Sequence, residues 1–408
     1  MSTATPVLSG LRTPLPHELP VEVVERKGIG HPDTLADGIA ELASIRYSQH
    51  CLDVAGAVLH HNLDKVAVLG GRAAFIDTDG TYDRPLRVVF GGRISTAFAG
   101  RALPVREILQ RAAVDHLRTA LPGFDRVTVQ VQHETTDSSK FPHWFAPRSL
   151  DDLPERRSAF SNDTAYLVGS APRTATETLV LLAEAFFRRL AWAGSDIKAL
   201  AVRDGQSWTV TVCVPALAGH MTSSAEFDDA VTAAAGELTE LLAQRLAGRV
   251  TVVCNTRGSR TGPLSRQYFT LSGSAVDYGE DGLVGRGNAR TGVISGAHLA
   301  GNEATFGKNP AYHVGKVGGW LADEAARTVP AEFGACRIAL LWRNGAPYNE
   351  PASIEITTAQ DVPPEAAEEP VRTTLSRTDW VEDLLAGRYL PAIEPVEALL
   401  ADLDRTSG

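Results

Sequence analysis

Nine consecutive residues near the start of the chain combine groups that can hold phosphate and a metal ion: Glu25-Arg26-Lys27-Gly28-Ile29-Gly30-His31-Pro32-Asp33. The segment is predicted to end a strand and to begin a helix at Pro32. Backbone N–H groups at a helix N-terminus attract anions, and glycines let a ligand approach the backbone closely. Asp33 could hold a cation that bridges phosphate oxygens. An ordinary capped turn explains Pro32 and Asp33 but not Lys27 and His31 together.

A second segment, 273–288, contains five glycines, three acids and one arginine in sixteen residues. It is followed by Gly307-Lys308-Asn309-Pro310 and by His313-Val314-Gly315-Lys316. Carboxylates beside cations are explained if the acids bind Mg²⁺ and the bases bind the oxygens of a polyphosphate. A solvated charged loop would not need so many glycines.

Two shorter polar segments carry weaker signals. The first is His60-His61-Asn62-Leu63-Asp64-Lys65. Adjacent residues of a strand point to opposite sides, so a structural role for at least one histidine is favoured over a metal site. The second, Ser161-Asn162-Asp163-Thr164, could be a simple turn or could present a carboxylate to an amino group.

Lysine is rare in this chain, which has 39 basic residues but only six lysines: Lys27, Lys65, Lys140, Lys198, Lys308 and Lys316. Where arginine supplies the general surface charge, a remaining lysine suggests a specific use. A compact ammonium group on a long stem suits a phosphate oxygen. We favour this interpretation for Lys27, Lys198 and Lys308 over Lys65 and Lys316.

The familiar nucleotide and hydrolase motifs do not occur. The sequence has no Walker loop, no nucleophile elbow, no kinase signature and no HExxH. We therefore expect a polyphosphate or nucleotide site that is built in an unusual way.

The elements that must position these groups mix strands and helices without a regular βαβ rhythm, which predicts an α+β class with largely antiparallel sheets. Three strand–strand–helix units can be drawn, although their sequences are not evidently similar. The predicted strands are 21–25, 67–71, 86–90, 126–133, 208–214, 250–254, 268–273, 337–342 and 353–358. One predicted helix starts at Pro32, and the others span 105–117, 176–192, 224–247, 314–327, 380–385 and 396–403. The acidic, proline-rich segment 363–370 is predicted to be a linker.

Composition and charge limit the class of protein to which the chain can belong. The chain has 408 residues, of which 44% are hydrophobic and 22% charged, as in an ordinary globular protein of two to three domains. A net charge of −10 argues against a nucleic-acid partner. Residues 1–20 lack a signal-peptide pattern, and no apolar run is long enough for a membrane span, so we expect a cytoplasmic protein. Of the four scattered cysteines, Cys213, Cys254 and Cys336 lie in apolar runs and are expected to be free buried thiols.

Taken together and in this order, the polar segments resemble those of the archaeal-type S-adenosylmethionine synthetases (methionine adenosyltransferases). The resemblance runs from about Val21 to Pro351 and is expected to cover the whole chain. The matching signatures are Glu-Arg-Lys-Gly-Ile-Gly-His-Pro-Asp, His-His-Asn-x-Asp-Lys, Asn-Asp-Thr, Gly-x-Asp-Ile-Lys, Gly-x-Asp-Gly-x-Val-Gly-Arg-Gly-Asn and Gly-Lys-Asn-Pro-x-x-His-Val-Gly-Lys.

The resemblance implies three intertwined α+β subdomains with pseudo-threefold symmetry over residues 21–360. Residues 1–20 would be an N-terminal extension, and 361–408 a linker and C-terminal helices that pack on the core. It also implies a homodimer whose active site lies at the interface, ATP and methionine as substrates, and Mg²⁺ (two ions expected) and K⁺ as cofactors. The methionine sulfur would attack C5′ of ATP and expel the whole triphosphate, which is then hydrolysed to pyrophosphate and phosphate.

Roles follow from the same resemblance, residue by residue. His31 would contact the region of the C5′ oxygen, Lys198, Arg286 and Lys308 would hold the triphosphate, and Asp33 and Glu280 would bind Mg²⁺. Asp163 would meet the methionine ammonium group. The remaining positions expected to bind substrate are Glu25, Lys27, Gly30, Asn62, Asp64, Thr164, Asp281, Gly285, Asn288 and His313.

The chain departs from the family pattern at Leu63, Glu280, Tyr312 and 341–345. None of these departures removes an expected catalytic group, so they leave the thioether substrate more open than the reaction. The alternatives are a family paralogue that uses another thioether amino acid, a Mg²⁺-dependent tripolyphosphate or nucleotide hydrolase, and a nucleotide-binding subunit without turnover.

Overall fold

The computed structural model describes residues 6–9, 14–141, 143–156 and 159–406. Residues 1–5, 10–13 and 407–408 of the expected terminal segments therefore lie outside the described residues. Among the helices described, none combines the length and the hydrophobicity that a membrane span requires.

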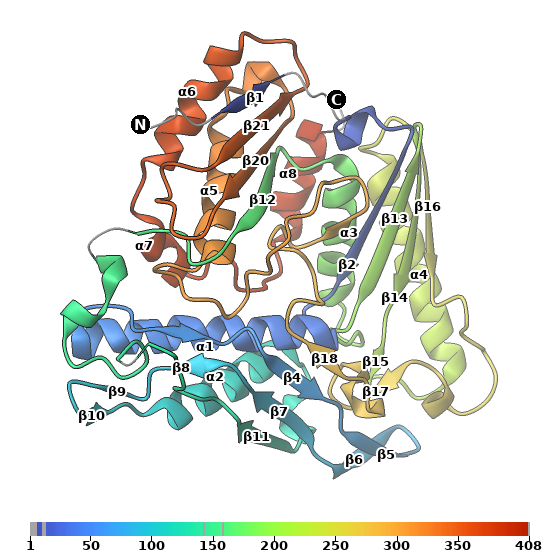
Figure 1. Ribbon diagram of the computed structural model, residues 1–408. Helices are drawn as coiled ribbons and strands as arrows, with labels where there is room; N and C mark the ends of the chain where they lie inside the picture. The colour runs from blue at the N-terminus through green and yellow to red at the C-terminus, as the bar shows by residue number, and fades with distance from the viewer. Residues whose placement is uncertain (1–5, 10–13, 142, 157–158, 407–408) are drawn as a thin grey trace.

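Three larger sheets organise the molecule (Figure 1). Their strands run in the orders β11-β7-β4-β18, β16-β14-β13-β2-β19 and β1-β21-β20-β12. The bounds are β1 Val7–Ser9, β2 Val21–Lys27, β4 Val66–Leu69, β7 Leu86–Phe90, β11 Val129–His133, β12 Ala165–Ala171, β13 Lys198–Asp204, β14 Ser207–Cys213, β16 Arg249–Cys254, β18 Gly282–Leu283, β19 Ile294–Ser295, β20 Cys336–Trp342 and β21 Ser353–Thr358.

Each of these sheets repeats one pattern. An antiparallel pair of strands (β4–β7, β13–β14 or β20–β21) has a parallel strand on the side of its second member, namely β11, β16 or β1. On the side of its first member it has an antiparallel strand, namely β18, β2 or β12. This threefold repetition, with mostly antiparallel pairing, confirms the predicted α+β class and its pseudo-threefold arrangement.

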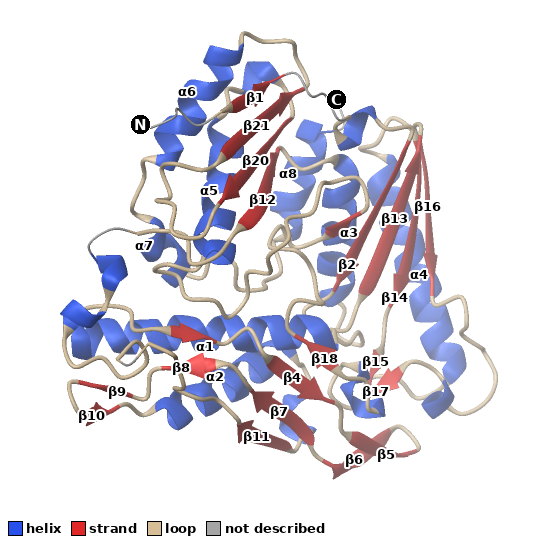
Figure 2. Cartoon of the chain, viewed as in Figure 1, coloured by secondary structure: helices blue, strands red, loops and turns tan. Residues whose placement is uncertain are grey.

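Helices cover each of these sheets (Figure 2). Each sheet has its own hydrophobic core. Helices α1 and α2 pack with the first sheet, α3, α4 and α8 with the second, and α5, α6 and α7 with the third. The bounds are α1 Pro32–Ala55, α2 Val105–Ala120, α3 Ala175–Arg188, α4 Ser224–Ala243, α5 Val314–Thr328, α6 Pro364–Leu375, α7 Trp380–Leu385 and α8 Val396–Thr406. The chain leaves and re-enters the three units, since β2 belongs to the second sheet and the following α1 to the first.

The remaining strands are short. They are β3 His61–Asn62 with β8 Arg93–Ile94, β9 Ala97–Phe98 with β10 Arg101–Ala102, β5 Arg72–Ile76 with β6 Asp79–Arg84, and β15 Ala216–Leu217 with β17 Phe269–Thr270. Only two residues of the predicted strand 268–273 pair in this way. Ser272 and Leu271 instead donate their backbone N–H groups to Asp277, which turns the chain out of the sheet.

The predicted linker at 363–370 is wrong, because these residues form most of α6. A proline is tolerated in the first turn of a helix, as at Pro364. Ala367, Val371 and Leu375 recur every four residues and are buried in the third core. Their burial holds the helix in spite of Pro370 in its interior.

The predicted burial of three cysteines holds only for Cys336, since Cys213 is exposed and Cys254 is half-buried. Cys213 lies on the face of β14 that points away from the helices, where alternate residues of a strand are open to solvent. The structural role expected for at least one of the paired histidines is confirmed. His61 is fully buried, with its Nε2 atom 2.8 Å from the Ser44 hydroxyl, and burial lowers its pKa to about 3.

Candidate active site

The first group of predicted residues meets where β2 runs into α1, beside β18 (Figure 1). Backbone hydrogen bonds from Gly28 to the Ile197 carbonyl (2.8 Å) and from Gly30 to the Ser195 carbonyl (3.0 Å) join this turn to the start of β13. A Cβ atom on Gly30 would lie 2.2 Å from the Ser195 hydroxyl, so only glycine allows this approach. In the same sheet Lys27 is paired directly with Lys198, which brings two scarce lysines together.

Asp33 lies in the first turn of α1 and connects three segments. Its Oδ2 atom is 2.9 Å from Lys27 Nζ, and its Oδ1 atom accepts a hydrogen bond from the Leu283 N–H at 3.0 Å. Burial alone would raise the pKa of Asp33, but the Leu283 hydrogen bond and the charge of Lys27 outweigh it and lower the pKa below its usual range. Asp33 is therefore a carboxylate at neutral pH.

Lys27 also fixes the glycine-rich segment that presents Arg286. Its Nζ atom donates to the Arg286 carbonyl at 2.6 Å, while its backbone exchanges two hydrogen bonds with the Asn288 side chain, at 3.0 and 2.7 Å. The Arg286 side chain itself is exposed. The segment that carries the exposed Arg286 side chain is thus tied to Asp33 through Lys27.

His31 is the N-cap of α1, and its Nδ1 atom accepts a hydrogen bond from the Asp33 N–H at 3.2 Å. Because Nδ1 is an acceptor, Nε2 carries the proton of the neutral ring and is free to donate it to a ligand. Burial lowers the pKa of His31, with Asp196 opposing this effect and Lys27 reinforcing it. The ring is thus a neutral hydrogen-bond donor rather than a cation at neutral pH.

Lys198 begins β13, the strand next to β2, and its Nζ atom is 3.0 Å from Glu25 Oε1. Its side chain is 48% exposed, so the ammonium group can leave Glu25 for a stronger anion. The first group therefore offers two exposed cationic side chains, Lys198 and Arg286, from segments that are hydrogen-bonded to the residues before α1.

Carboxylates at 280–281 border the same turn. Asp281 is exposed and accepts a hydrogen bond from the Gly70 N–H at 2.8 Å, and a Cβ atom on Gly282 would collide with Pro32 O at 1.9 Å. Glu280 is exposed as well. No three histidine, cysteine or acidic residues in the described ranges form a cluster that could hold a metal ion. Mg²⁺ keeps several waters and takes substrate phosphates with one or two carboxylates, so Asp33 and Glu280 suit it without such a cluster.

A second group is built around Lys308, which is only 4% exposed. Its ammonium group pairs with Glu303 and lies 3.9 Å from Asp64 Oδ2, and its backbone bridges to Asn62. His313, the N-cap of α5, is buried beside it; burial lowers its pKa well below the usual value, and Lys308 and Lys316 lower it further. Lys308 is thus a cation held in place by carboxylates.

The two groups are neighbours but do not coincide. The Lys308 carbonyl accepts a hydrogen bond from Ser44, eleven residues beyond Asp33 on α1, a separation of about 16 Å along the helix axis. Between them Leu283 pairs with Ala67, and a Cβ atom on Gly285 would lie 3.5 Å from Ala304. One chain therefore presents the predicted site residues as two separate groups, which we call half-sites below.

Asp163 and Thr164 form a third, smaller group. Both are exposed, and the Thr164 hydroxyl accepts a hydrogen bond from the Asn344 N–H at 3.1 Å. The neighbouring Asn162 accepts one from the N–H of Val314, which follows His313. These residues therefore adjoin the Lys308 group rather than His31.

Sequence reasoning missed three buried acids that support these groups: Asp37, Glu41 and Asp196. Asp196 is buried beside His31; burial raises its pKa, His31 lowers it, and Glu280 raises it further. The signal for the other two was the spacing Asp33, Asp37 and Glu41 along α1, which places the acids on one face of the helix.

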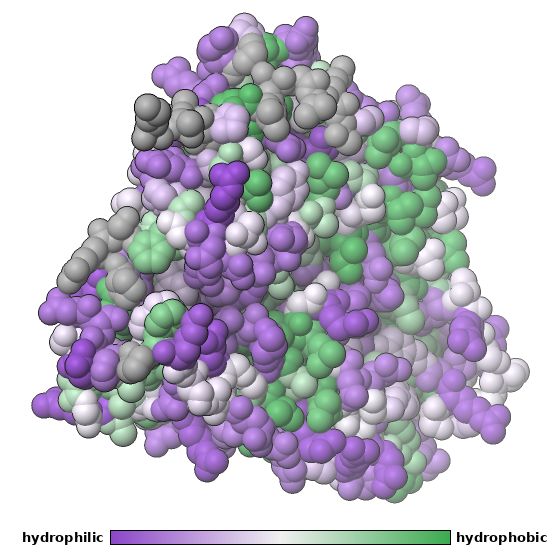
Figure 3. All heavy atoms as spheres, in the orientation of Figure 1, coloured by the Kyte–Doolittle hydropathy of each residue, from purple (hydrophilic) through white to green (hydrophobic). Residues whose placement is uncertain are grey.

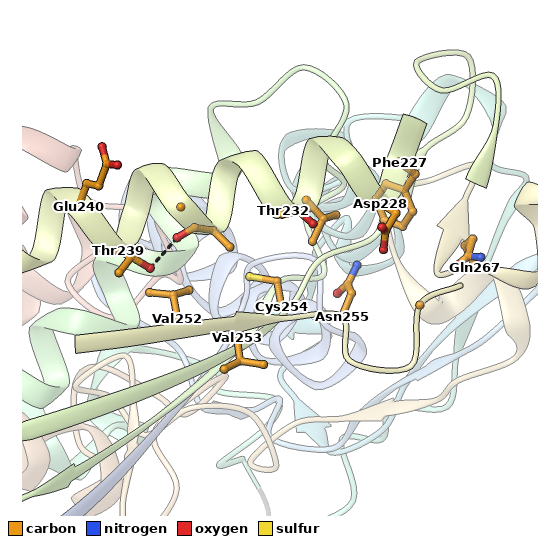
Figure 4. A pocket seen from close by; sticks show the side chains of 14 residues that line it. Phe227, Asp228, Thr232, Thr239, Glu240, Val252, Val253, Cys254, Asn255 and Gln267 are labelled. Atoms are coloured by element: carbon orange, nitrogen blue, oxygen red, sulfur yellow. Dashed lines mark hydrogen bonds between the residues drawn. The ribbon is translucent and has the colours of Figure 1, made fainter. Parts of the chain in front are cut away.

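Two hollows lie near the second sheet. One, of about 520 Å³ between α4 and β16, has Phe227 and Thr232 above Val252 and Cys254 and contains none of the predicted residues (Figure 4). The other, of about 1070 Å³, is lined in part by Gly285, Asn288 and Glu303. Only the second adjoins the candidate site.

Comparison with known proteins identifies the family. The model of the S-adenosylmethionine synthetase (AdoMet synthetase) family matches residues 7–384, which is nearly the whole chain. The chain belongs to the S-adenosylmethionine synthetase family, whose members are methionine adenosyltransferases.

Relatives support this assignment. The chain is 34% identical to an S-adenosylmethionine synthase of Haloarcula marismortui (84% of this chain, 86% of the relative) and 32% identical to one of Methanococcus aeolicus (86% and 88%). It is 33% identical to an uncharacterized protein of Streptococcus pyogenes serotype M3 (88% and 91%). An unusual S-adenosylmethionine synthetase from Campylobacter jejuni shares the fold, with a TM-score of 0.56, 15% identity, and coverage of 95% of this chain and 100% of that one.

Proposed function

We propose that this chain transfers the adenosyl group of ATP to the sulfur of L-methionine and expels the triphosphate whole. A sulfur lone pair forms the bond to C5′ while the bond from C5′ to the triphosphate oxygen breaks, which gives a sulfonium product. The triphosphate is then hydrolysed to pyrophosphate and phosphate. The observation that carries the proposal is the group at the start of α1, where a neutral histidine donor caps the helix and two exposed cations, Lys198 and Arg286, belong to the segments hydrogen-bonded to the residues before it.

The chemistry of a thioether fits this site. The sulfur nucleophile is neutral and needs no general base, so catalysis rests on alignment and on stabilising the charge of the leaving group. His31 Nε2–H would donate to the oxygen that gains charge at C5′. Lys198, Arg286 and Lys308 would bind the triphosphate oxygens, with Lys27, Gly30, Gly285 and Asn288 holding the backbone around them.

Mg²⁺ would be held by Asp33 and Glu280 and would neutralise charge on the triphosphate. Lys27 and the Leu283 N–H keep Asp33 ionised in the free protein, ready for a cation. Asp163 would bind the methionine ammonium group, with Asn62, Asp64 and His313 around Lys308. These residues can bind the same ATP only if the His31 half-site and the Lys308 half-site face one another.

We propose that a homodimer meets this requirement, each site combining the His31 group of one chain with the Lys308 and Asp163 groups of its partner. The second sheet has one face packed on α3 and α4 and one open face. Val21 is 46% and Val23 39% exposed there, in rows that continue through Val202 and Thr209. Hydrophobic residues gather over β2, β13 and β16, at the right of Figure 3. The open face ends at Lys27 and Lys198, so a chain docked on it would reach the first half-site.

A charge on this face tests the dimer. Val23→Glu should give a folded monomer with little activity, because a carboxylate would be buried against the partner. Ile76→Glu is the matched control: Ile76 is 69% exposed on the β5–β6 hairpin, away from this face, and its variant should keep the wild-type mass and activity. Sedimentation velocity gives the mass, and a dimeric, fully active Val23→Glu protein would contradict the proposal.

The reaction itself is tested by mass spectrometry of products formed from ATP, Mg²⁺, K⁺ and L-methionine, beside a reaction without methionine. S-adenosylmethionine with methionine-dependent release of pyrophosphate and phosphate is the expected result. Phosphate release that ignores methionine would replace the proposal with a hydrolase. A sulfonium product from a different thioether alone would assign the chain to a paralogue, and ATP binding without any product would indicate a binding subunit.

A further inference from the structure

Asp37 lies one turn beyond Asp33 on α1 and is only 1% exposed. Its Oδ1 atom accepts a hydrogen bond from the Gly285 N–H at 2.7 Å. Gly285 immediately precedes Arg286 in the glycine-rich segment. The side chain therefore holds the backbone on one side of Arg286 to the helix.

The same carboxylate also touches the other side of Arg286. A Cβ atom built on Gly287 would lie 2.1 Å from Asp37 Oδ2, far inside van der Waals contact. Gly287 does not have a left-handed backbone conformation, so this contact rather than strain requires glycine there. The glycines at 285 and 287 thus let the segment fold around a single carboxylate.

Other anchors hold the segment at its ends and at one carbonyl between them. Leu283 is bound to Asp33, and Asn288 is bound to the backbone of Lys27. Between them the Arg286 carbonyl is held by the Lys27 side chain. Asp37 is the anchor that comes from the rigid interior of α1 and reaches both neighbours of Arg286.

We propose that Asp37 is a positioning residue that sets where the guanidinium group of Arg286 lies. The inference rests on the proposed function, in which Arg286 binds the departing triphosphate. Asp37 contacts neither substrate nor metal in this account and acts through the backbone at 285–287. A displacement of about 1 Å in such a group can cost a hundredfold in rate.

A double-mutant cycle tests the contact from both sides. Asp37→Ala removes the anchor and Gly287→Ala displaces it, so each should lower kcat on the order of tenfold to a hundredfold, with a smaller change in the KM for ATP. The added methyl group meets only the Asp37 side chain at short range. The clash is absent when Asp37 is alanine. The kcat of the double variant should therefore be at most about threefold below the kcat of the less active single variant.

Two further variants separate positioning from general damage. Asp37→Asn keeps an oxygen that can accept from the Gly285 N–H and should retain most of the activity that Asp37→Ala loses. Gly236→Ala, on α4 with nothing within 4 Å of the new Cβ atom, is the control for a glycine-to-alanine change and should match the wild type. If Asp37→Ala fails to fold, Gly287→Ala and Asp37→Asn still test the contact.

Hydrogen exchange gives a readout that does not depend on the reaction. Exchange of the Gly285 amide should accelerate in Asp37→Ala and stay near the wild-type rate in Asp37→Asn. If the wild type forms no sulfonium product, the proposed function is wrong. The exchange result still tests whether Asp37 holds the backbone at Gly285. The inference would be overturned if the fold-decreases in kcat of Asp37→Ala and Gly287→Ala multiplied in the double variant. Unchanged exchange of the Gly285 amide in Asp37→Ala would also overturn it.

Discussion

Lys198→Met should lower kcat for S-adenosylmethionine formation by on the order of a hundredfold or more, with the thermal midpoint close to that of the wild type. In the proposed mechanism Lys198 stabilises charge that appears on the triphosphate as the C5′ bond breaks, and losing one such contact has an effect of this size. The half-exposed ion pair with Glu25 contributes little to folding, about 0–1 kcal/mol once solvent screening is included.

Steady-state kinetics with a melting curve distinguishes the two effects. Lys140→Met removes another lysine, one that lies over the Phe141 ring and outside the candidate site, and should keep wild-type kcat. A Lys198→Met enzyme with kcat within threefold of the wild type would remove Lys198 from the mechanism. A large fall in its melting temperature would instead assign it a structural role.

Lys316→Met should destabilise the folded protein by about 3–5 kcal/mol, because it leaves Glu41 as an uncompensated buried charge. Both side chains of this ion pair are 1% exposed, and Glu41 also accepts a hydrogen bond from the Gly307 N–H at 3.0 Å. Burial lowers the pKa of Lys316, and Glu41 opposes that effect, so the pair depends on its mutual contact. Urea unfolding with and without the substitution measures the difference.

A double variant shows that the unpaired charge is the cause. Lys316→Met combined with Glu41→Gln removes both charges and keeps an oxygen for the Gly307 N–H, so it should recover most of the lost stability. Equal destabilisation of the single and the double variant would mean that lost packing, rather than the charge, decides the result. The pair supports the segment that carries Lys308, so activity should fall together with stability.

The fold class and most helices could be predicted because hydrophobic periodicity is strong along α2, α3 and α5. The helix at 364–375 could not be predicted because Pro363 and Pro370 are typical of a linker and obscure the apolar positions at every fourth residue. The order of the strands in the sheets could not be predicted from the sequence, because β1 pairs with β21 and β18 with β4, which are far apart in the chain. Such long-range pairing depends on tertiary packing that local patterns do not contain.

For the site, the polar segments identified the residues but not their grouping. Glycine, lysine and aspartate close together in sequence indicated where phosphate chemistry could occur, and His31, Asp33 and Lys198 do lie together. The separation of Lys308 from that group follows from the length of α1, which no motif reveals. The supporting acid Asp37 was overlooked because a carboxylate in a helix is ordinarily a solvated residue.

The interleaving of the three sheets has a consequence for how the chain is made. Val7 pairs with Ile354, so the outer strand of the third sheet is synthesised long before its partner. Likewise β2 needs β13, and β4 needs β18, before either sheet is complete. None of the three sheets is therefore built from one continuous stretch of chain, as the sheet of a domain that folds by itself during translation would be. The third sheet in particular cannot be completed before β21 has been synthesised, so its assembly depends on slow, long-range contacts.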